Sequence, residues 1–185
     1  MANVARSLRV WGTEMIRRAR GCAEMKLLAF AAVVSLAAAP ALAQNAAQVA
    51  HAEDGASCPG CNLFQANLYN KDLRGRNYAG ARLRQADMSL SVFNHVNFAG
   101  GDLRDVNGYG ALFTSANLKK VDLTNATLVG AYLQGANFRG ANLTGVNFSG
   151  AEMDRAVGLT EAQLSGACGD EATTLPRGLH LRPCG

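Results

Sequence analysis

The sequence is poor in the side chains that usually carry catalysis or fill an irregular core. Of its 185 residues only 6% are aromatic and one is tryptophan, whereas 20 are glycine. This composition favours a regular architecture of small residues. The three histidines, His51, His95 and His180, are far apart in the chain and have no repeated carboxylate or thiol beside them. We therefore predict that the protein is not an enzyme and has no metal or cofactor site.

The chain also lacks an excess of either charge outside its N-terminus. The first 43 residues carry six Lys or Arg against two Asp or Glu, which accounts for the whole net charge of +4. From Gln44 onward, 12 basic residues meet 12 acidic ones. A neutral mature chain argues against both a phosphate-binding protein and an acidic mimic of DNA, so no nucleic-acid partner is predicted. The glycines form no phosphate-binding fingerprint between a strand and a helix.

Residues 25–43 have the pattern of an export signal. Lys26 precedes an apolar run over residues 27–39, and Pro40 leads to a small-residue triplet that ends at Ala43. The run is shorter than the roughly 20 residues that a membrane-spanning helix needs. We expect cleavage after Ala43, no stable membrane anchor afterwards, and a periplasmic or secreted protein.

The true start of the chain remains open between two alternatives. Translation from Met25 would give an ordinary signal, whereas residues 1–24 would make a long n-region containing the pair Arg17-Arg18, a weak twin-arginine signal. We favour Met25. No cysteine follows Ala43 directly, so a lipoprotein anchor is not expected.

A five-residue period dominates the chain from Leu63 to Met153. Of the 19 positions at this spacing, 18 hold Leu, Phe, Tyr or Met, and Gly108 is the exception. The residue two places earlier is Ala or Val in 14 units, and Lys71 and Arg76 are the large exceptions. This spacing fits neither one face of an α-helix nor one face of a flat strand. The chain must therefore turn once in each unit, where the glycine found in nine units allows a positive φ.

The units ANLKK, ANFRG and ANLTG, which begin at Ala116, Ala136 and Ala141, resemble those of the pentapeptide-repeat family. The resemblance implies an all-β fold, a right-handed four-sided parallel β-helix with one pentapeptide on each side. Leucine recurs every 20 residues from position 63 to position 143, as stacking of such coils would favour. Some family members mimic B-form DNA and protect DNA gyrase. The export signal and the neutral mature charge disfavour that alternative here.

The repeat divides the chain into four parts, and the last should contain a short helix that begins after Thr160. That part is expected to cover the final coil, since an open solenoid end exposes unpaired backbone groups. Gly108 should leave a cavity on the axis unless the coil bulges there. The four parts are an export signal over 1–43, a flexible linker over 44–57, the β-helix over 58–155 and a C-terminal cap over 156–185.

The mature chain has four cysteines, an even number that suits disulfides in an oxidising compartment. Of the three possible connectivities we favour Cys58–Cys61 with Cys168–Cys184, because each pair would then fix one end of the repeat. The CPGC sequence also allows a thiol-disulfide redox site or half of a zinc site. Neither has its usual context, because a β-helix follows directly and the second pair has a different spacing.

Two outward surfaces stand out when the repeat is stacked in coils. The apolar corner comprises Leu90, Val92, Tyr109, Leu112, Val129 and Tyr132. It would either dock an unknown protein partner or a second copy of the chain, or be an ordinary exposed apolar surface. The charged face comprises Arg82, Arg84, Asp102, Arg104 and Asp122, where we expect exposed ion pairs and assign no ligand. The sequence thus favours an exported structural or interaction scaffold.

Overall fold

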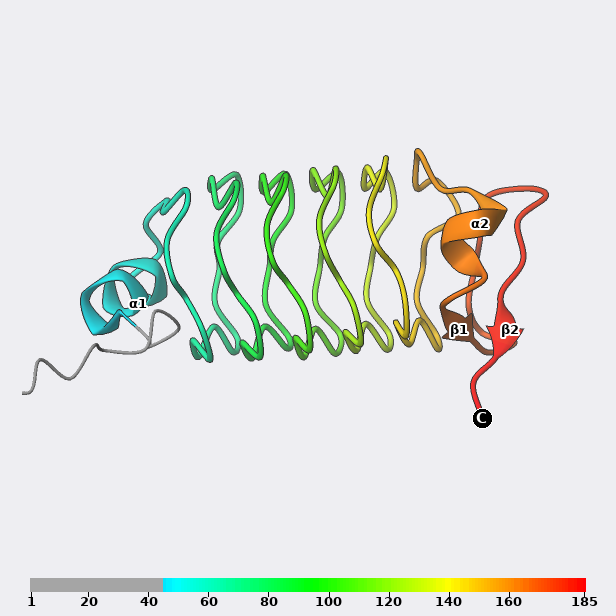
Figure 1. The fold of residues 1–185 in the computed structure, drawn as a ribbon, viewed down its shortest axis with the longest axis horizontal. Coiled ribbons are helices and arrows are strands. Elements are labelled where there is room, and N and C mark those ends of the chain that lie inside the picture. Colours follow the sequence, from blue (N-terminus) through cyan, green and yellow to red (C-terminus); the bar gives the residue numbers. More distant parts are fainter. Residues whose placement is uncertain (1–44) are drawn as a thin grey trace, which may run out of the picture. The chain divides into compact units, whose positions relative to one another are not determined.

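The computed structural model describes residues 45–185. The expected export signal and its cleavage site lie outside the described residues. Figure 1 shows a stack of coils with α1 at one end and α2, β1 and β2 at the other. These elements span Ala46–Glu53, Glu161–Leu164, Cys168–Gly169 and Arg182–Pro183. Within residues 45–185, no helix has the length and apolar character needed to cross a membrane.

Isolated parallel bridges between residues 20 positions apart hold the coils together. They recur every five residues from the pair Asn62–Arg82 to the pair Asn137–Val157, so each coil contains four pentapeptides. The central residue of a unit donates its N–H to the next coil, as Leu63 does to the Arg82 carbonyl at 2.7 Å. Each bridge involves one residue per side, which is why few longer strands are present. This is the four-sided parallel β-helix that the resemblance to pentapeptide repeats implies.

The large central residues fill the axis of this stack. All of them from Leu63 to Met153 are at most 2% exposed. Aromatic rings stack on one another in successive coils, with centroids 5.7 Å apart for Tyr78 and Phe98. Burial of these apolar side chains is the main favourable term that holds the coils closed.

The turn position, two residues after each central residue, has a positive φ from residue 60 to residue 150. Ten of these positions are glycine and nine are not, including Leu90 at φ 55°. The Asn or Asp before a central residue stabilises the turn. For example, Asn107 Oδ1 accepts the N–H of Tyr109 at 3.2 Å. The backbone is therefore regular even where the sequence is not.

Gly108 leaves neither the cavity nor the bulge that its place in the axis suggested. The bridges Asp87–Asn107 and Asn107–Thr127 keep the 20-residue register. A Cβ atom on Gly108 would lie 2.6 Å from Leu128 Cδ2 of the next coil. The leucine side chain thus occupies the space that a large residue at position 108 would fill.

The expectation of a flexible linker over residues 44–57 is wrong for residues 46–53, which form α1. Asn45 is the N-cap, and its Oδ1 accepts the N–H of Gln48 at 3.2 Å. Val49 and Ala52 are buried in the same core cluster as the first coil. An open solenoid end exposes apolar side chains, so an alanine-rich segment beside it gains stability by folding onto it.

Beyond Val157 the chain leaves the 20-residue register, forms α2 and then returns to the stack. Thr160 is the N-cap of α2, as expected, and its hydroxyl accepts the N–H of Gln163. β2 pairs in parallel with β1 on the outer side of the stack. Two bridges join this C-terminal segment to the last coil: Asn147–Cys168 and Glu152–Thr174.

Candidate functional site

At the N-terminal end of the stack no coil precedes the first one, and side-chain oxygens accept hydrogen bonds from its backbone N–H groups. In later coils the N–H of the residue before each central residue bonds to a carbonyl of the preceding coil, but the first coil has none. Gln48 Oε1 accepts the Asn62 N–H at 2.7 Å, and Glu53 Oε1 accepts the Asn67 N–H at 3.2 Å. On a third side, Ser57 Oγ accepts the backbone N–H of Asn77 at 3.0 Å. The helix-capping Asn45 was the sequence signal that could have revealed α1.

The Cys58–Cys61 pair is present as a disulfide and forms part of the first turn. The Cys58 N–H donates to the Asn77 carbonyl at 2.9 Å, and the Gly60 N–H donates to Ala79 at 2.9 Å, the pattern of the later units. Both cysteines are buried, at 6% and 8% exposure. A redox cysteine needs an accessible thiol, typically at a helix N-terminus, and this turn supplies neither.

The structure does not bring the histidines together. His51 lies in α1, His95 occupies a turn in the coils, and His180 belongs to the C-terminal segment, where its Nδ1 lies 3.1 Å from Glu161 Oε1. Within residues 45–185, no group of three or more His, Cys, Asp or Glu side chains could hold a metal ion.

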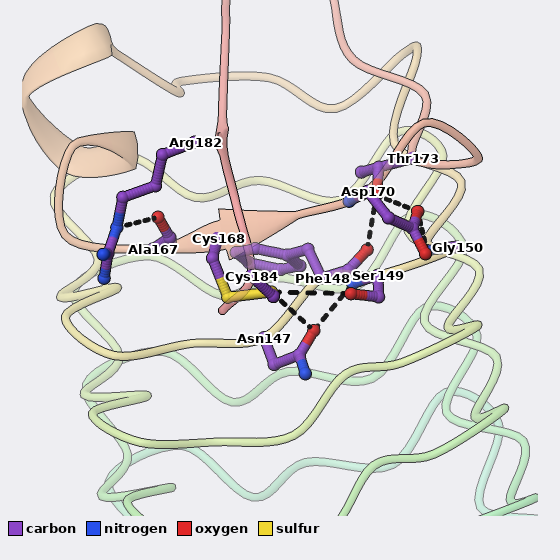
Figure 2. Close-up of a disulfide and its surroundings, with 10 residues drawn as sticks. All are labelled: Asn147, Phe148, Ser149, Gly150, Ala167, Cys168, Asp170, Thr173, Arg182 and Cys184. Atoms are coloured by element: carbon purple, nitrogen blue, oxygen red, sulfur yellow. Dashed lines mark hydrogen bonds between the residues drawn. A yellow bond between two sulfur atoms is a disulfide. The ribbon is translucent and has the colours of Figure 1, made fainter.

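Figure 2 shows the second disulfide, Cys168–Cys184, against the last coil. It joins β1 to the residue that follows β2, and Ser149 Oγ lies 3.5 Å from Cys184 Sγ. Beside it, Asp170 Oδ1 accepts the Gly150 N–H at 2.8 Å, and this bond lowers the pKa of Asp170. Side chains from the C-terminal segment therefore bond directly to the last coil.

Gln163 of α2 lies on a side of the last coil where no β-bridge joins that coil to the C-terminal segment. Its Nε2 donates to the carbonyls of Phe138 and Ala141 at 3.0 and 2.9 Å. On the next side the Val146 carbonyl, the equivalent of that of Ala141, accepts instead from the backbone N–H of Cys168 at 2.9 Å. The sequence predicted α2 but not this role of Gln163.

The charged face is a set of ion pairs, as expected. Arg104 binds Asp102 through two hydrogen bonds of 2.7 and 2.6 Å and lies 3.8 Å from Asp122. The bond from Arg104 lowers the pKa of Asp102 and raises that of Arg104. Arg84 binds Asp105 at 3.1 Å, a partner that the sequence pattern did not single out. A hollow of about 180 Å³ lies here, lined by Asn62, Phe64, Arg82, Arg84, Gln85, Asp102 and Arg104.

The structure brings the six residues of the apolar corner together. Val92, Leu112 and Tyr132 form consecutive parallel bridges, so their side chains lie in one column with one residue per coil. The other three lie in the preceding turns of the same coils. The Leu90 N–H donates to the Tyr109 carbonyl at 2.9 Å, and the Gly110 N–H donates to the Val129 carbonyl at 2.9 Å.

The apolar corner is exposed. Tyr109 is 53% exposed, Leu90 46% and Tyr132 41%. Val92, Leu112 and Val129 are half-buried. A Cβ atom on Gly110 would lie 2.8 Å from Leu90 Cδ2, so this glycine makes room for the leucine. The surface is a continuous apolar area across three coils.

Acidic residues border the column of Val92, Leu112 and Tyr132 at both ends. Asp72 forms the next bridge on one side and Glu152 the next on the other. Arg74 Nη2 donates a hydrogen bond of 2.5 Å to Asp72 Oδ2, and this bond lowers the pKa of Asp72. Glu152 accepts a hydrogen bond of 2.8 Å from Gln134 Nε2. A polar rim around an apolar centre is the usual composition of a protein interface.

Solved pentapeptide-repeat structures resemble the chain. HetL, involved in heterocyst differentiation regulation in Nostoc sp. strain PCC 7120, is 26% identical over 72% of this chain and 57% of HetL, with a TM-score of 0.42. The protein alr5209 of Nostoc PCC 7120 is 26% identical over 56% and 84% of the two chains, with a TM-score of 0.46. QnrB1, a plasmid-mediated fluoroquinolone resistance protein, is 17% identical over 64% and 76%, with a TM-score of 0.32.

The match therefore spans little more than half of HetL. No curated protein sequence matches the chain. The family profile for pentapeptide repeats matches eight copies, over residues 77–107, 91–130, 122–157 and 131–168. With the profile match and the 20-residue bridges, the chain belongs to the pentapeptide-repeat family and has its β-helix fold.

Proposed function

We propose that the mature protein is an exported, non-enzymatic scaffold of the periplasm or cell envelope that binds protein through the apolar corner. The observation that carries this proposal is the exposure of Tyr109, Leu90 and Tyr132 on one continuous surface. Monomeric proteins rarely expose large contiguous apolar areas, and such areas mark interaction sites. The rigid stack fixes the spacing of these side chains, which suits a binding surface.

The compartment in this proposal is supported by the signal-like residues 25–43 and by the two disulfides. In an oxidising compartment these disulfides would fix the first turn and the C-terminal segment. We also propose that the C-terminal segment and α1 act as caps, because their side chains bond to backbone groups at the ends of the stack.

Gyrase protection is less well supported than a scaffold role. A DNA mimic needs a strongly acidic surface, but here Arg84 pairs with Asp105 and Arg104 pairs with Asp102. The likeness to QnrB1 is 17% in sequence and supports the fold alone. A thiol-redox role is also less well supported, because Cys58 and Cys61 are buried.

The test is cross-linking in cells that export the protein, followed by mass spectrometry of the cross-linked proteins. We expect specific cross-links that are lost in the double variant Tyr109→Ser and Tyr132→Ser. The control is Val157→Ser, which removes an apolar side chain, 49% exposed, outside the apolar corner. Unchanged cross-links in the tyrosine variant would contradict the proposal. The mass of the exported protein also tests cleavage after Ala43.

A further inference from the structure

We infer that the hollow on the charged face is a binding site for a small carboxylic acid that carries an apolar or aromatic group. The inference goes beyond the proposed function, because it concerns a different surface. Ten residues, half of a 20-residue coil, separate Arg82 at the hollow from Val92 in the column of the apolar corner. The two surfaces therefore lie on opposite sides of the stack.

Most of the lining of the hollow comes from two columns of outward side chains, with one residue per coil. They are Asn62, Arg82 and Asp102, which consecutive bridges join, and Phe64, Arg84 and Arg104, which follow them by two residues. The residue between the two columns in each coil is a leucine that is buried in the axis. The register of the stack thus brings three arginines and one aspartate around one small hollow.

Two of these arginines already bind the carboxylates near the hollow. Arg104 donates from Nε and Nη2 to the two oxygens of Asp102, at 2.7 and 2.6 Å. Its Nε also lies 3.8 Å from Asp122 Oδ2. Arg84 donates from Nε to Asp105 Oδ2 at 3.1 Å, a contact that leaves its two terminal nitrogens out. Each of the three aspartates is therefore paired with Arg84 or Arg104.

Arg82 is the arginine of the hollow that these aspartates leave unpaired. Its side chain is exposed and makes no ion pair or hydrogen bond with any residue of 45–185. Asp102 is its bridge neighbour, but Arg104 holds both oxygens of that aspartate. A guanidinium presents its N–H donors in a planar fork that fits the two oxygens of a carboxylate. Arg82, with the terminal nitrogens of Arg84 from the same pentapeptide, can therefore bind the carboxylate of a ligand.

Phe64 and the size of the hollow limit the rest of the ligand. Phe64 is half-buried, and the equivalent positions in the next two coils are arginine. An aromatic ring favours contact with an apolar or ring-shaped group. The hollow of about 180 Å³ is smaller than the roughly 300–1,000 Å³ of pockets for drug-sized ligands. Benzoate, a carboxylate on a single ring, combines these features and serves as the probe.

The balance of charge around the hollow sets the expected affinity. Three aspartates lie beside three arginines, so the long-range attraction for an anion is small. Direct hydrogen bonds to Arg82 and contact with Phe64 should then decide which molecules bind. We expect a dissociation constant for benzoate in the millimolar range.

The first experiment is an NMR titration of the purified mature protein with benzoate, followed through the backbone amide signals. We expect saturable shifts at Arg82 and the other residues of the hollow, and none with benzamide, which has the same ring but no charge. Inorganic phosphate should bind more weakly, because it has no group to pack on Phe64. Equal shifts with benzamide, or phosphate binding as tight as that of benzoate, would overturn the inference.

A pair of matched variants then tests the role of Arg82. Arg82→Gln should weaken benzoate binding about tenfold, because it removes a charged hydrogen-bond donor. The control is Arg139→Gln, which removes another exposed arginine that has no ion pair within residues 45–185 and lies on another side of the stack. The amide spectra check that both variants are folded. Unchanged binding in Arg82→Gln, or an equal loss in Arg139→Gln, would overturn the inference.

The double variant Tyr109→Ser and Tyr132→Ser separates this site from the proposed function. It should bind benzoate as the wild type does, since its substitutions lie on the far side of the stack from the hollow. Unchanged benzoate binding in this variant supports a separate site. Loss of that binding would overturn the inference and leave the scaffold proposal standing.

Discussion

The side-chain oxygen of Gln48 in α1 accepts the backbone N–H of Asn62 in the first coil at 2.7 Å. At the opposite end of the stack, the side-chain nitrogen of Gln163 donates to the carbonyls of Phe138 and Ala141. Gln48 supplies an acceptor to an N–H group and Gln163 supplies a donor to carbonyls, so the same residue type satisfies the two ends through opposite ends of its amide. This difference gives two predictions of opposite outcome for the same substitution.

At Gln48, Ala should be destabilising and Glu should be tolerated. Gln48→Ala leaves the part-buried Asn62 N–H without its acceptor, which should cost about 1 kcal/mol of unfolding free energy. Gln48→Glu keeps an acceptor oxygen in the same place. Urea denaturation measures the loss, and amide hydrogen exchange at Asn62 should accelerate only in the alanine variant. Equal protection of this amide in wild type and Gln48→Ala would contradict the assignment.

At Gln163, the order of stability of the alanine and glutamate variants should be the reverse of that at Gln48. Gln163→Ala removes a donor from two carbonyls and should cost about 1–2 kcal/mol. Gln163→Glu places a carboxylate against the same carbonyls and should be worse than alanine at neutral pH. The measurement is the urea midpoint of the two variants. A glutamate variant as stable as wild type would show that the amide donor has no structural role.

Gly108→Ala should destabilise the stack, because the added Cβ would lie 2.6 Å from Leu128 Cδ2. Overpacking of this kind typically costs about 1–3 kcal/mol. Adding Leu128→Val should recover part of the loss, since it shortens the side chain that collides. A double-mutant cycle by urea denaturation measures this coupling. Strictly additive effects of the two substitutions would contradict direct contact.

Tyr78 should make stability depend on pH in the alkaline range. Burial raises its pKa from 10.0 to about 12, and its hydroxyl donates to the Ala56 carbonyl at 2.9 Å. A raised folded-state pKa means that the stabilising contribution is complete below pH 10 and is lost as the pH rises through 12. Unfolding free energy should therefore fall over this window, and less steeply in Tyr78→Phe. The same slope in both proteins would exclude Tyr78 as the cause.

The two disulfides should differ in their contribution to stability. The cysteines of the C-terminal pair are 16 positions apart and those of the CPGC pair are three apart. Chain-entropy estimates give about 3 kcal/mol for the longer loop and about 1.6 kcal/mol for the shorter. Replacing Cys168 and Cys184 with Ser should thus lower the thermal midpoint more than the same change at Cys58 and Cys61. Thiol titration of the unfolded, unreduced wild type should find no free thiol in the mature chain.

The sequence determined the coil, because its five-residue period is a local property of every unit. A large residue at the centre, a small one two places earlier and an Asn or Asp before the centre were enough to predict turns and a buried axis. Even the nine non-glycine turns with positive φ follow from this period, since backbone pairing with neighbouring coils imposes the conformation. The composition of the apolar corner also followed, once the resemblance to pentapeptide repeats supplied a 20-residue register to extend along the chain.

The tertiary structure alone decided what happens where the period stops. The fold of residues 46–53 into α1 depends on the open end of a coil, whose apolar axis and unpaired N–H groups lie beyond the helix itself. The space beside Gly108 is filled by Leu128 from the next coil, a contact between units that no single unit encodes. Likewise Gln163 meets carbonyls that precede it by 22 and 25 residues. Local periodicity specifies a repeating backbone. The structure at the ends of the stack depends on which side chains reach the unpaired backbone groups there, and the packing beside Gly108 depends on which side chain reaches the empty space.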